Sequence, residues 1–433
     1  MQEIKHPSQP LGEGSETEST SLASSSAMVS RAHCPYRQSL LLQQALAPDK
    51  MRVAFFLGAG CPMAIRVTEG AATKPLIPDV KGLTKVICDS LSTSTSYKVA
   101  FETVLHRLSD SGKAEPNVEQ ILSYVRALGE VVGNDGIEGL SSQVLNNLDK
   151  EICRVTTEVV KVRLSEDNTP YHQLATWIRG IPRTQSVEIF TSNYDLLMDQ
   201  ALEEQQVPYF DGFVGSDSTF FDLASMEQDN LPSRWARLWK VHGAINWWRT
   251  AKGDFERRKE SDSSDLQMIY PSHLKYLESR RMPYLAMLDR LKSFLSRGQA
   301  VLVTCGYSFS DDHLNEAILQ GLAGNPTAVC FALLFGDRKI APNAVAKARK
   351  HSNLRLLATD GAVLGTIEAD WHSDEKKEHA LHGVAVQTGE MVFRSHAPAQ
   401  RCKFLLGDFA SLGNFLAQQI AFGEDENERS KAK

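Results

Sequence analysis

The chain has 433 residues, of which 42% are hydrophobic and 23% are charged, and its formal net charge is −6. These values are typical of a globular protein, and the modest negative charge excludes a global electrostatic attraction to nucleic acid or to an anionic membrane. No run reaches the roughly 18 apolar residues that a membrane-spanning helix needs. We therefore expect a cytoplasmic protein that binds neither nucleic acid nor membrane directly.

The two ends of the chain and its cysteines are informative. Residues 1–33 are rich in Ser and Glu and lack the apolar core of a secretory signal, so we predict a disordered tail there. Residues 426–433 are predicted to be a frayed end. Seven scattered cysteines form no CxxC pair and no Cys/His spacing that suits zinc, which predicts reduced thiols and no zinc site.

Six short apolar, β-branched runs are predicted strands: 52–57, 187–191, 237–242, 299–305, 328–335 and 353–358. Most are almost continuously hydrophobic, as expected of parallel strands that are covered on both faces. Helical patterns lie between them, for example at 273–297 and 312–322. This alternation predicts an α/β fold with a Rossmann-like, doubly wound, mostly parallel sheet of about six strands.

Two further segments complete the predicted organisation. The interval 80–185 is helical in pattern and is predicted to be an insertion between the first two strands. Beyond residue 360, GAVLGTIEADW and GVAVQTGEMVF are predicted short strands, followed by a closing helix capped by Asp408. We therefore expect a catalytic domain at 34–360 and a C-terminal β/α extension at 361–425 packed on it.

Polar residues collect where the predicted strands end. Ligands of open α/β sheets sit outside the carboxyl ends of the strands, so the loops that leave these ends are the candidate site. The four loops are Gly58-Ala59-Gly60, Thr191-Ser192-Asn193-Tyr194-Asp195, His242-Gly243 and Gly306-Tyr307-Ser308-Phe309-Ser310-Asp311.

Each loop also has a simpler explanation. The Gly-Ala-Gly turn lacks the third glycine of GxGxxG, which leaves a tight turn and a phosphate-binding loop equally open; in the second case, backbone N–H groups of residues 59–61 would face a pyrophosphate. Asn193 and Asp195 have the composition of turn residues that bond their own backbone. His242 has no obvious packing duty, although a single histidine is more often structural.

For two other groups we favour a structural role over a functional one. Cys61 is beside a predicted helix start, but no base is placed for it by sequence, so we interpret it as a packing residue. Asp311, Asp312 and His313 suggest a metal site, yet they open a helix. N-capping by Ser310 or Asp311 is the favoured explanation.

In chain order, LGAG, SNYD, KVHG and GYSFSDDHLN resemble the motifs of the sirtuin superfamily, and specifically the prokaryotic sirtuin-like NAD-consuming proteins of antiviral defence. The segments NVEQILSYV at 117–125, HGAINWW at 242–248 and MIYPSHLKY at 268–276 are similar to the subgroup encoded beside a HerA-type ATPase. The resemblance covers roughly residues 45–335.

The resemblance implies roles for individual residues. Asn193 would face the nicotinamide ribose and position the attacking water, and His242 would be the catalytic histidine. The remaining assignments are the diphosphate loop at Gly58, Ala59 and Gly60, the loop-ordering acid Asp195, the adenine-side ribose and phosphate contacts Gly306 and Ser308, and Asp79 near the nicotinamide pocket.

Two departures from the family pattern matter. Pro62 occupies a position where the family usually has Ser, so one hydrogen bond near the phosphates is expected to be missing. Residues 243–298 contain no cysteine, whereas histone-deacylating sirtuins hold zinc there with two CxxC pairs.

The resemblance implies an NAD+ hydrolase that releases nicotinamide and ADP-ribose, acting as an abortive-infection effector against phage. It also implies a homo-oligomer and a HerA-type hexameric ATPase as partner. Two alternatives stay open at this point: an NAD-dependent protein deacylase, and a subunit that binds NAD+ or ADP-ribose without cleaving it.

Overall fold

The structure is a computed structural model. Its elements belong to one compact unit, Arg31–Lys433. The residues that it describes are 32–48, 51–70, 72–113, 115–133, 136–165, 168–228, 230–250, 254–258, 283–373, 380–394 and 397–431.

The described residues form a 12-stranded main sheet, most of whose inner part is parallel. From one edge of the parallel part to the other, the strands are β6 (Tyr209–Phe210), β9 (Ala236–Lys240), β5 (Glu188–Thr191), β2 (Arg52–Leu57), β12 (Ala300–Cys305), β13 (Val329–Leu333) and β14 (Leu354–Leu357). All six strands predicted from the sequence are present in this part, within two residues of the predicted ends.

The sheet continues past β14 with strands that run in alternating directions. These are β15 (Gly361–Leu364), β16 (Ile367–Ser373), β18 (Ala397–Phe404) and β17 (Val386–Arg394), while β1 (Ala32–His33) pairs in parallel with β16. The expected size of about six strands is therefore wrong, because the C-terminal extension joins the same sheet by hydrogen bonds. β1 also corrects the predicted tail, since Ala32 and His33 are part of a strand; residues 1–31 lie outside the described residues.

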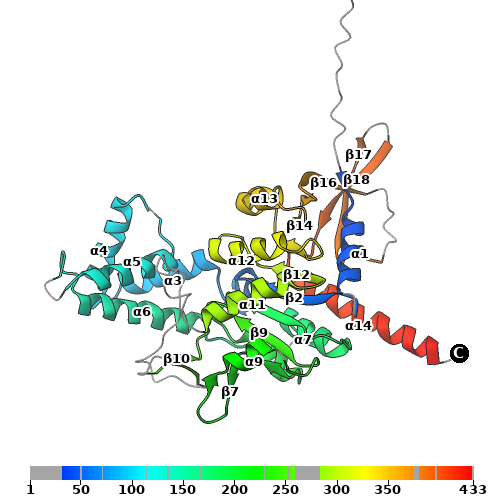
Figure 1. The fold of residues 1–433 in the computed structure, drawn as a ribbon. Coiled ribbons are helices and arrows are strands. Elements are labelled where there is room, and N and C mark those ends of the chain that lie inside the picture. The colour runs from blue at the N-terminus through cyan, green and yellow to red at the C-terminus, as the bar shows by residue number, and fades with distance from the viewer. Residues whose placement is uncertain are drawn as a thin grey trace, which may run out of the picture. The chain divides into compact units, whose positions relative to one another are not determined.

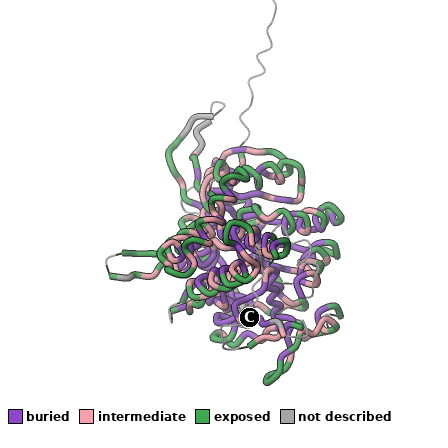
Figure 2. Tube along the Cα trace, turned by 90° about the vertical axis from the view of Figure 1, so that its left-hand side faces the viewer, coloured by how far each residue is buried: buried purple, intermediate pink, exposed green. Residues whose placement is uncertain are grey.

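The parallel strands are buried on both faces. Along β2, Val53, Phe55 and Leu57 face one hydrophobic core, and Ala54 and Phe56 face the other. This follows from the two-residue period of a strand, and it explains why the run is apolar throughout. In Figure 2 the buried residues are concentrated in the interior, and exposed residues lie on the outer sides of the helices.

Helices cover the two faces, as expected of a doubly wound sheet (Figure 1). The first face packs on α1 (Pro35–Ala45), α7 (Pro170–Gly180), α8 (Leu197–Glu204) and α14 (Phe409–Lys431). The second face packs on α11 (Tyr284–Ser296), α12 (Asp312–Ala323) and α13 (Pro342–Ala348). The predicted helix at 273–297 is thus confirmed from Tyr284 onward, and its first part lies outside the described residues.

The predicted helical insertion is present between β2 and β5. Its helices are α3 (Val80–Ser92), α4 (Lys98–Asp110), α5 (Val118–Val131) and α6 (Ser142–Val160). We call these four helices the helical module. Smaller elements are α2 (Gly60–Met63), η1 (Arg338–Ile340), α9 (Leu223–Gln228) and the strand pairs β3 (Arg66–Glu69) with β4 (Ala72–Pro75), β7 (Phe213–Val214) with β8 (Phe220–Phe221), and β10 (Trp247–Arg249) with β11 (Phe255–Arg257).

The C-terminal end differs from the prediction. The Asp408 carboxylate accepts a hydrogen bond from the Ala410 N–H at 3.3 Å, which confirms the predicted cap. However, α14 continues to Lys431, so residues 426–431 are helical rather than frayed. Glu, Arg and Lys are good helix formers, and a helix already nucleated by packed residues extends through them at little cost.

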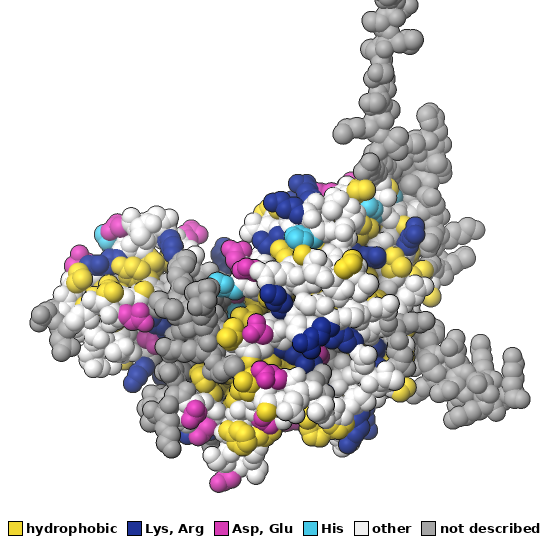
Figure 3. Space-filling model, viewed as in Figure 1, with side chains coloured by type: hydrophobic (Ala, Val, Ile, Leu, Met, Phe, Trp, Pro, Cys, Tyr) yellow, Lys and Arg dark blue, Asp and Glu magenta, His cyan; other side chains and the backbone are white. Residues whose placement is uncertain are grey.

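The mixed charges on the surface agree with the modest net charge of the sequence. On the face of the molecule seen in Figure 3, Lys and Arg side chains are interspersed with Asp and Glu. Within the described part of the chain, no helix is long and apolar enough to span a bilayer.

Candidate active site

The polar loops meet at the carboxyl edge of the parallel strands, where the sheet reverses its direction of growth. From β2 the sheet extends through β5 and β9 on one side, and through β12 to β14 on the other. The register aligns Leu57 with both Thr191 and Cys305, so the loops that leave β2, β5 and β12 begin side by side. Open α/β sheets bind ligands at such a switch point.

Gly58 and Gly60 lie directly against the backbone of Gly306. The Gly60 N–H donates to the Gly306 carbonyl at 2.9 Å. A Cβ on Gly58 would lie 2.3 Å from the Gly306 oxygen, and Gly306 itself has a φ of +65°. Close packing between two loops therefore requires these glycines even when no ligand is bound.

This packing limits which residues of the predicted diphosphate loop can contact a ligand. The N–H groups of Gly60 and Cys61 donate inside the protein, to Gly306 and to the Gly58 carbonyl at 2.9 and 3.0 Å. Ala59 is the residue of the Gly-Ala-Gly turn that lines the neighbouring cavity. We therefore infer that Gly58 and Gly60 are glycines because the two loops pack closely there. A ligand would contact this turn through Ala59.

The cavity has a volume of about 500 Å³ and lies between the switch-point loops and the helical module. Residues from all four predicted loops line it, so the structure brings the separate motifs together in one place. The helical module contributes a wall that the motifs did not predict. The lining includes Ala59, Asn193, Asp195, His242, Ser308, Asp311, Asp312 and His313 from the loops, and Asn117, Glu119, Gln120 and Ser123 from the module.

Asn193 is fixed by two hydrogen bonds, one to the loop after β2 and one to the last residue of β5, the strand that it follows. Its amide Nδ2 donates to the Gly58 carbonyl at 3.1 Å, and its backbone N–H donates to the Thr191 hydroxyl at 3.0 Å. That hydroxyl in turn donates to the Leu57 carbonyl at 2.9 Å. With the amide nitrogen held toward the glycine loop, the side-chain oxygen is the group left to accept a hydrogen bond.

Asp195 is buried and orders the same loop. Its carboxylate accepts the Leu197 N–H at 3.0 Å. This is the geometry of a turn residue that bonds its own backbone, the simpler of the two interpretations of Asp195. Burial raises the pKa of Asp195, and the nearby Lys240 ammonium opposes that shift. Lys240 donates to the Asp195 carbonyl at 2.7 Å and lies 2.7 Å from the Asp199 carboxylate. The loop is thus held by a buried charge network.

His242 pairs with Asp311 at the wall of the cavity. Its Nε2 lies 3.3 Å from Asp311 Oδ2, and their side chains are only 12% and 13% exposed. The His242 ring also lies beside the Tyr194 ring, with 6.4 Å between the ring centroids. Gly243, with a φ of +84°, allows the chain to turn immediately after the histidine.

Asp311 has a second contact, which confirms the N-cap prediction. Its Oδ1 accepts the N–H groups of His313 and Leu314 at 3.0 and 3.2 Å at the start of α12. Among the described residues there is no group of three or more His, Cys, Asp or Glu that would hold a metal ion.

The loop from Gly306 to Asp311 is held in place by Asn315. The buried Asn315 side chain donates to the Phe309 carbonyl and accepts from the Tyr307 hydroxyl, both at 2.9 Å. Phe309 has a φ of +57°, a conformation that non-glycine residues rarely adopt. Ser308 lines the cavity, and its hydroxyl lies 2.8 Å from that of Ser310.

Asp79 lies beside the cavity, but its carboxylate caps a helix. It accepts the Gly82 N–H at 2.8 Å at the start of α3. Its neighbours Pro78 and Val80 line the cavity. Asp79 therefore positions this wall, and its contact with a ligand stays a prediction.

The charged side chains around the cavity are mostly acidic. Four carboxylate residues line it, and no Lys or Arg does so among the described residues; the carboxylates are Glu119, Asp195, Asp311 and Asp312. Two histidines, His242 and His313, are the groups there that can become cationic. The described lining thus favours positive charge in a ligand.

Cys61 has the environment of a buried packing residue and not of a reactive thiol. Burial raises the pKa of its thiol well above the usual value, and the thiol donates to the Cys305 carbonyl at 3.2 Å. Because the thiolate is the nucleophilic form, this environment makes Cys61 inert and confirms its interpretation as a packing residue.

Sequence reasoning missed three features of the candidate site. It identified Asp311 as a cap but not as the partner of His242. It did not single out Asn315, although the position follows the loop motif closely in GYSFSDDHLN. The cavity wall formed by Asn117, Glu119 and Gln120 lies in NVEQILSYV, a segment noted for its resemblance and not for a place in the site.

Comparison with known proteins gives a family match over part of the chain. Residues 187–357, about two-fifths of the chain, match the family model described as a SIR2-like domain. This segment of the chain is similar to a SIR2-like domain. Five of the predicted site residues fall inside it, namely Asn193, Asp195, His242, Gly306 and Ser308, whereas the glycine turn at 58–60 and Asp79 precede it.

Thirty-four chains of solved structures also match. One of them is a mutant Sir2 homologue in complex with ADP-ribose. It is 12% identical, the match covers 67% of this chain and 83% of that chain, and the TM-score is 0.29. No curated protein matches the chain.

Proposed function

We propose that the protein hydrolyses NAD+ at the bond between nicotinamide and ribose, giving nicotinamide and ADP-ribose. One observation carries the proposal: Asn193 and His242, which leave two different strands, line a single cavity at the switch point of the sheet, within the segment that is similar to a SIR2-like domain. Binding alone requires neither an amide fixed by the backbone nor a histidine paired with a carboxylate.

The reaction needs an activated water and a way to accept its proton. The C1′–N bond breaks with its electron pair going to the nicotinamide nitrogen, which neutralises the positive ring. The water oxygen forms the new bond to C1′ and loses one proton to the protein. In this proposal the Asn193 side-chain oxygen orients the water, and a neutral His242 accepts the proton, a role worth roughly a hundredfold to ten-thousandfold in rate.

The acidic lining supports this choice at the nicotinamide end of the substrate, because the diphosphate of NAD+ is itself negatively charged. NAD+ carries its positive charge on the nicotinamide ring, and the ribose becomes oxocarbenium-like as the bond breaks. Carboxylates in a partly dry cavity stabilise such developing positive charge. Glu119 and Asp311 supply them at the cavity wall.

We further propose that this activity depletes NAD+ as an abortive-infection response to phage, in a homo-oligomer controlled by a HerA-type ATPase. The motif resemblance supports these assignments. An enzyme that consumes a central cofactor must be silent until triggered, which supports control by assembly.

The test is the loss of NAD+ over time, followed by chromatography, for the purified protein alone and mixed with a HerA-type ATPase. Wild type, Asn193→Ala and His242→Ala are compared, with Phe220→Ala on β8 as an exposed control variant outside the cavity. We expect wild type and the control to form equal amounts of nicotinamide and ADP-ribose, and the two site variants to form little of either. Survival of NAD+ in every mixture, with binding still measurable by calorimetry, would refute the hydrolase and favour a binding subunit.

A further inference from the structure

We infer that Asp311 is the positioning residue of His242: its carboxylate fixes which ring nitrogen of the histidine carries the proton. This inference rests on the proposed function, because it assigns how the proposed base is prepared for its task. Nothing in the motif comparison distinguishes Asp311 from an ordinary helix cap.

The geometry joins the two halves of the sheet. His242 follows β9, on one side of β2, and Asp311 follows β12, on the other side. The two residues approach to 3.3 Å between Nε2 and Oδ2 with both side chains largely buried. The contact therefore spans the switch point where the proposed substrate binds.

The two oxygens of the carboxylate have separate partners. Oδ1 accepts two backbone N–H groups of α12, so the side chain cannot turn away from its position. Oδ2 is thereby presented to His242. A helix cap needs only one acceptor oxygen, and Ser, Thr or Asn serve as well as Asp. The second oxygen is thus not required by the helix.

A carboxylate oxygen accepts hydrogen bonds and has no proton to donate. Its neighbour Nε2 must therefore carry the hydrogen, which makes Nδ1 the basic atom of the neutral His242 ring. Asp311 also stabilises the imidazolium that forms once His242 has taken a proton from water. Both effects act on the chemical step, so kcat should change far more than KM when the Asp311 carboxylate is removed.

The experiment compares Asp311→Ser and Asp311→Asn with wild type. Both replacements keep an N-cap for α12 but remove the charged oxygen that faces His242. Glu316→Gln, an exposed position on the same helix, controls for the loss of one negative charge. We expect kcat for NAD+ hydrolysis to fall by roughly a hundredfold or more in both Asp311 variants, with KM within about threefold of wild type and with unchanged thermal unfolding.

A second readout does not depend on activity. Long-range ¹H–¹⁵N correlation spectra of the full chain labelled at histidine nitrogen, recorded at about pH 8.5 where an ordinary imidazole is neutral, report the tautomer of each ring. The His242 signals are identified by their loss in His242→Gln. We expect the Nε2–H form in wild type and a shift toward the Nδ1–H form, or a mixture, in Asp311→Ser.

The outcomes separate this inference from the proposed function. Equal kcat in wild type and both Asp311 variants, or an unchanged His242 tautomer in Asp311→Ser, would overturn the inference and leave Asp311 as a cap. Absence of NAD+ hydrolysis in wild type would instead overturn the proposed function, and the tautomer spectra would then decide the inference alone.

Discussion

At the scale of single residues, the site depends on a backbone contact that leaves no room for a side chain. Gly58 and Gly306 meet at the centre of the sheet edge, and the contact fixes the spacing between the loops after β2 and β12. The cavity forms on top of this contact, so its shape is determined by two residues that contribute no functional group.

Gly58→Ala should therefore disrupt both the fold and the site. The new Cβ would lie 2.3 Å from the Gly306 oxygen, which forces the backbone apart. We expect the free energy of unfolding to fall by about 1–3 kcal/mol, the usual cost of overpacking, measured by urea denaturation. Gly133→Ala is the matched control, because a methyl group at that position would point into open space, with no neighbouring atom within 4 Å. Equal stability of the two variants would contradict the loop-packing role.

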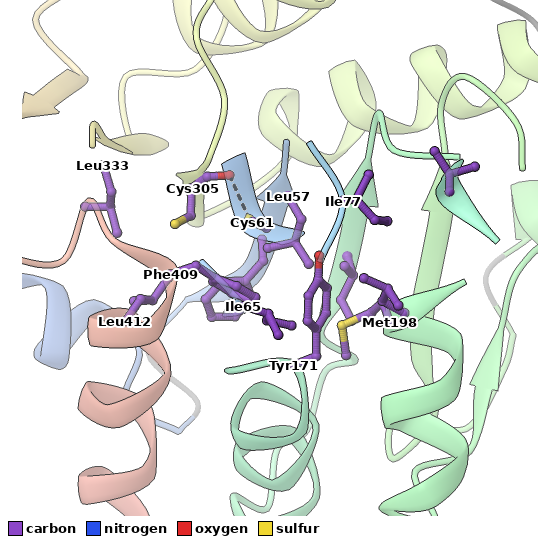
Figure 4. Packing of buried hydrophobic residues seen from close by; sticks show 14 of the residues in the cluster. Leu57, Cys61, Ile65, Ile77, Tyr171, Met198, Cys305, Leu333, Phe409 and Leu412 are labelled. Atoms are coloured by element: carbon purple, nitrogen blue, oxygen red, sulfur yellow. Dashed lines mark hydrogen bonds between the residues drawn. The ribbon is translucent and has the colours of Figure 1, made fainter. Parts of the chain in front are cut away.

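Tyr171 illustrates the opposite case, a polar atom without an evident purpose. Its ring rises from α7 into the core beneath the site (Figure 4), and the residue is 1% exposed. The hydroxyl has no hydrogen-bond partner of normal geometry among the described residues. Burial raises the pKa of Tyr171 well above its usual value, and the nearby Asn193 side chain only partly lowers it.

We expect Tyr171→Phe to leave the free energy of unfolding unchanged or to raise it by up to about 1 kcal/mol. Removing a buried hydroxyl that makes no bond removes a desolvation cost and keeps the shape of the ring. The measurement is urea denaturation of the two proteins under the same conditions. A loss above about 1 kcal/mol would show instead that the hydroxyl makes a stabilising bond, with Asn193 as the nearest candidate.

At the scale of elements, the loop between β12 and α12 is held in an unfavourable conformation. Phe309 adopts a positive φ, and the Asn315 side chain ties its carbonyl and the Tyr307 hydroxyl to the first turns of α12. The same loop presents Ser308 and Asp311 to the cavity. Loop geometry and helix start are thus one cooperative arrangement.

Asn315→Ala should release this loop. We expect a loss of about 1–3 kcal/mol in the free energy of unfolding, because two buried hydrogen bonds are removed and their partners are left unpaired. We also expect a higher KM for NAD+, since the cavity wall loses its fixed shape. Gln320→Ala, an exposed position on the same helix, serves as control in both assays. An Asn315→Ala protein with the stability of this control would refute the role.

The parallel strands were predictable because burial on both faces leaves a nearly uninterrupted apolar run, as in VAFFL of β2. The strands of the C-terminal extension were harder. β18, with the sequence APAQRCKF, is mixed in character and becomes a strand only through pairing with β16 and β17. The helical end of α14 depends on packing of its first turns against α7 and the sheet, which no local pattern shows.

The site was predictable as a set of loops and not as a set of contacts. Parallel strands bring their carboxyl ends to one edge, so chain position alone placed Asn193 and His242 together. The pairing of His242 with Asp311 depends on the angle at which α12 leaves β12, which is fixed by Asn315 and by backbone packing. The wall at Glu119 depends on how the helical module docks, and that is a tertiary property.

At the scale of the whole molecule, several ionisable groups are buried in their neutral form. Burial raises the pKa of Cys153 on α6 to about 12. The pKa values of Cys61, Tyr171 and Tyr307 are also raised well above their usual values, mainly by burial. In the unfolded chain a thiol ionises near pH 8.5 and a tyrosine near pH 10, so above about pH 8.5 the folded state holds more protons than the unfolded state.

The protein should therefore lose stability at alkaline pH. A raised folded-state pKa stabilises the fold below the unfolded-state value, and this stabilisation is lost as the pH rises toward the folded-state value. For Cys153 the window is about pH 8.5 to 12, and the loss is about 1.4 kcal/mol per pH unit. Urea denaturation at several pH values between about 7.5 and 10.5 gives the free energy of unfolding at each pH. We expect this free energy to fall less steeply with pH in Cys153→Val than in wild type. Parallel slopes would contradict the prediction.

The contact between Gly58 and Gly306 also has a consequence for the protein during translation. β2 is made early, but its neighbour β12 begins only at Ala300, after the helical module and the first half of the site. Pairings between such distant segments form late and slowly. A nascent chain that ends before β12 therefore lacks the glycine contact, the cavity and the partner of His242. If the protein consumes NAD+, translation itself delays the appearance of that activity until most of the chain has been made.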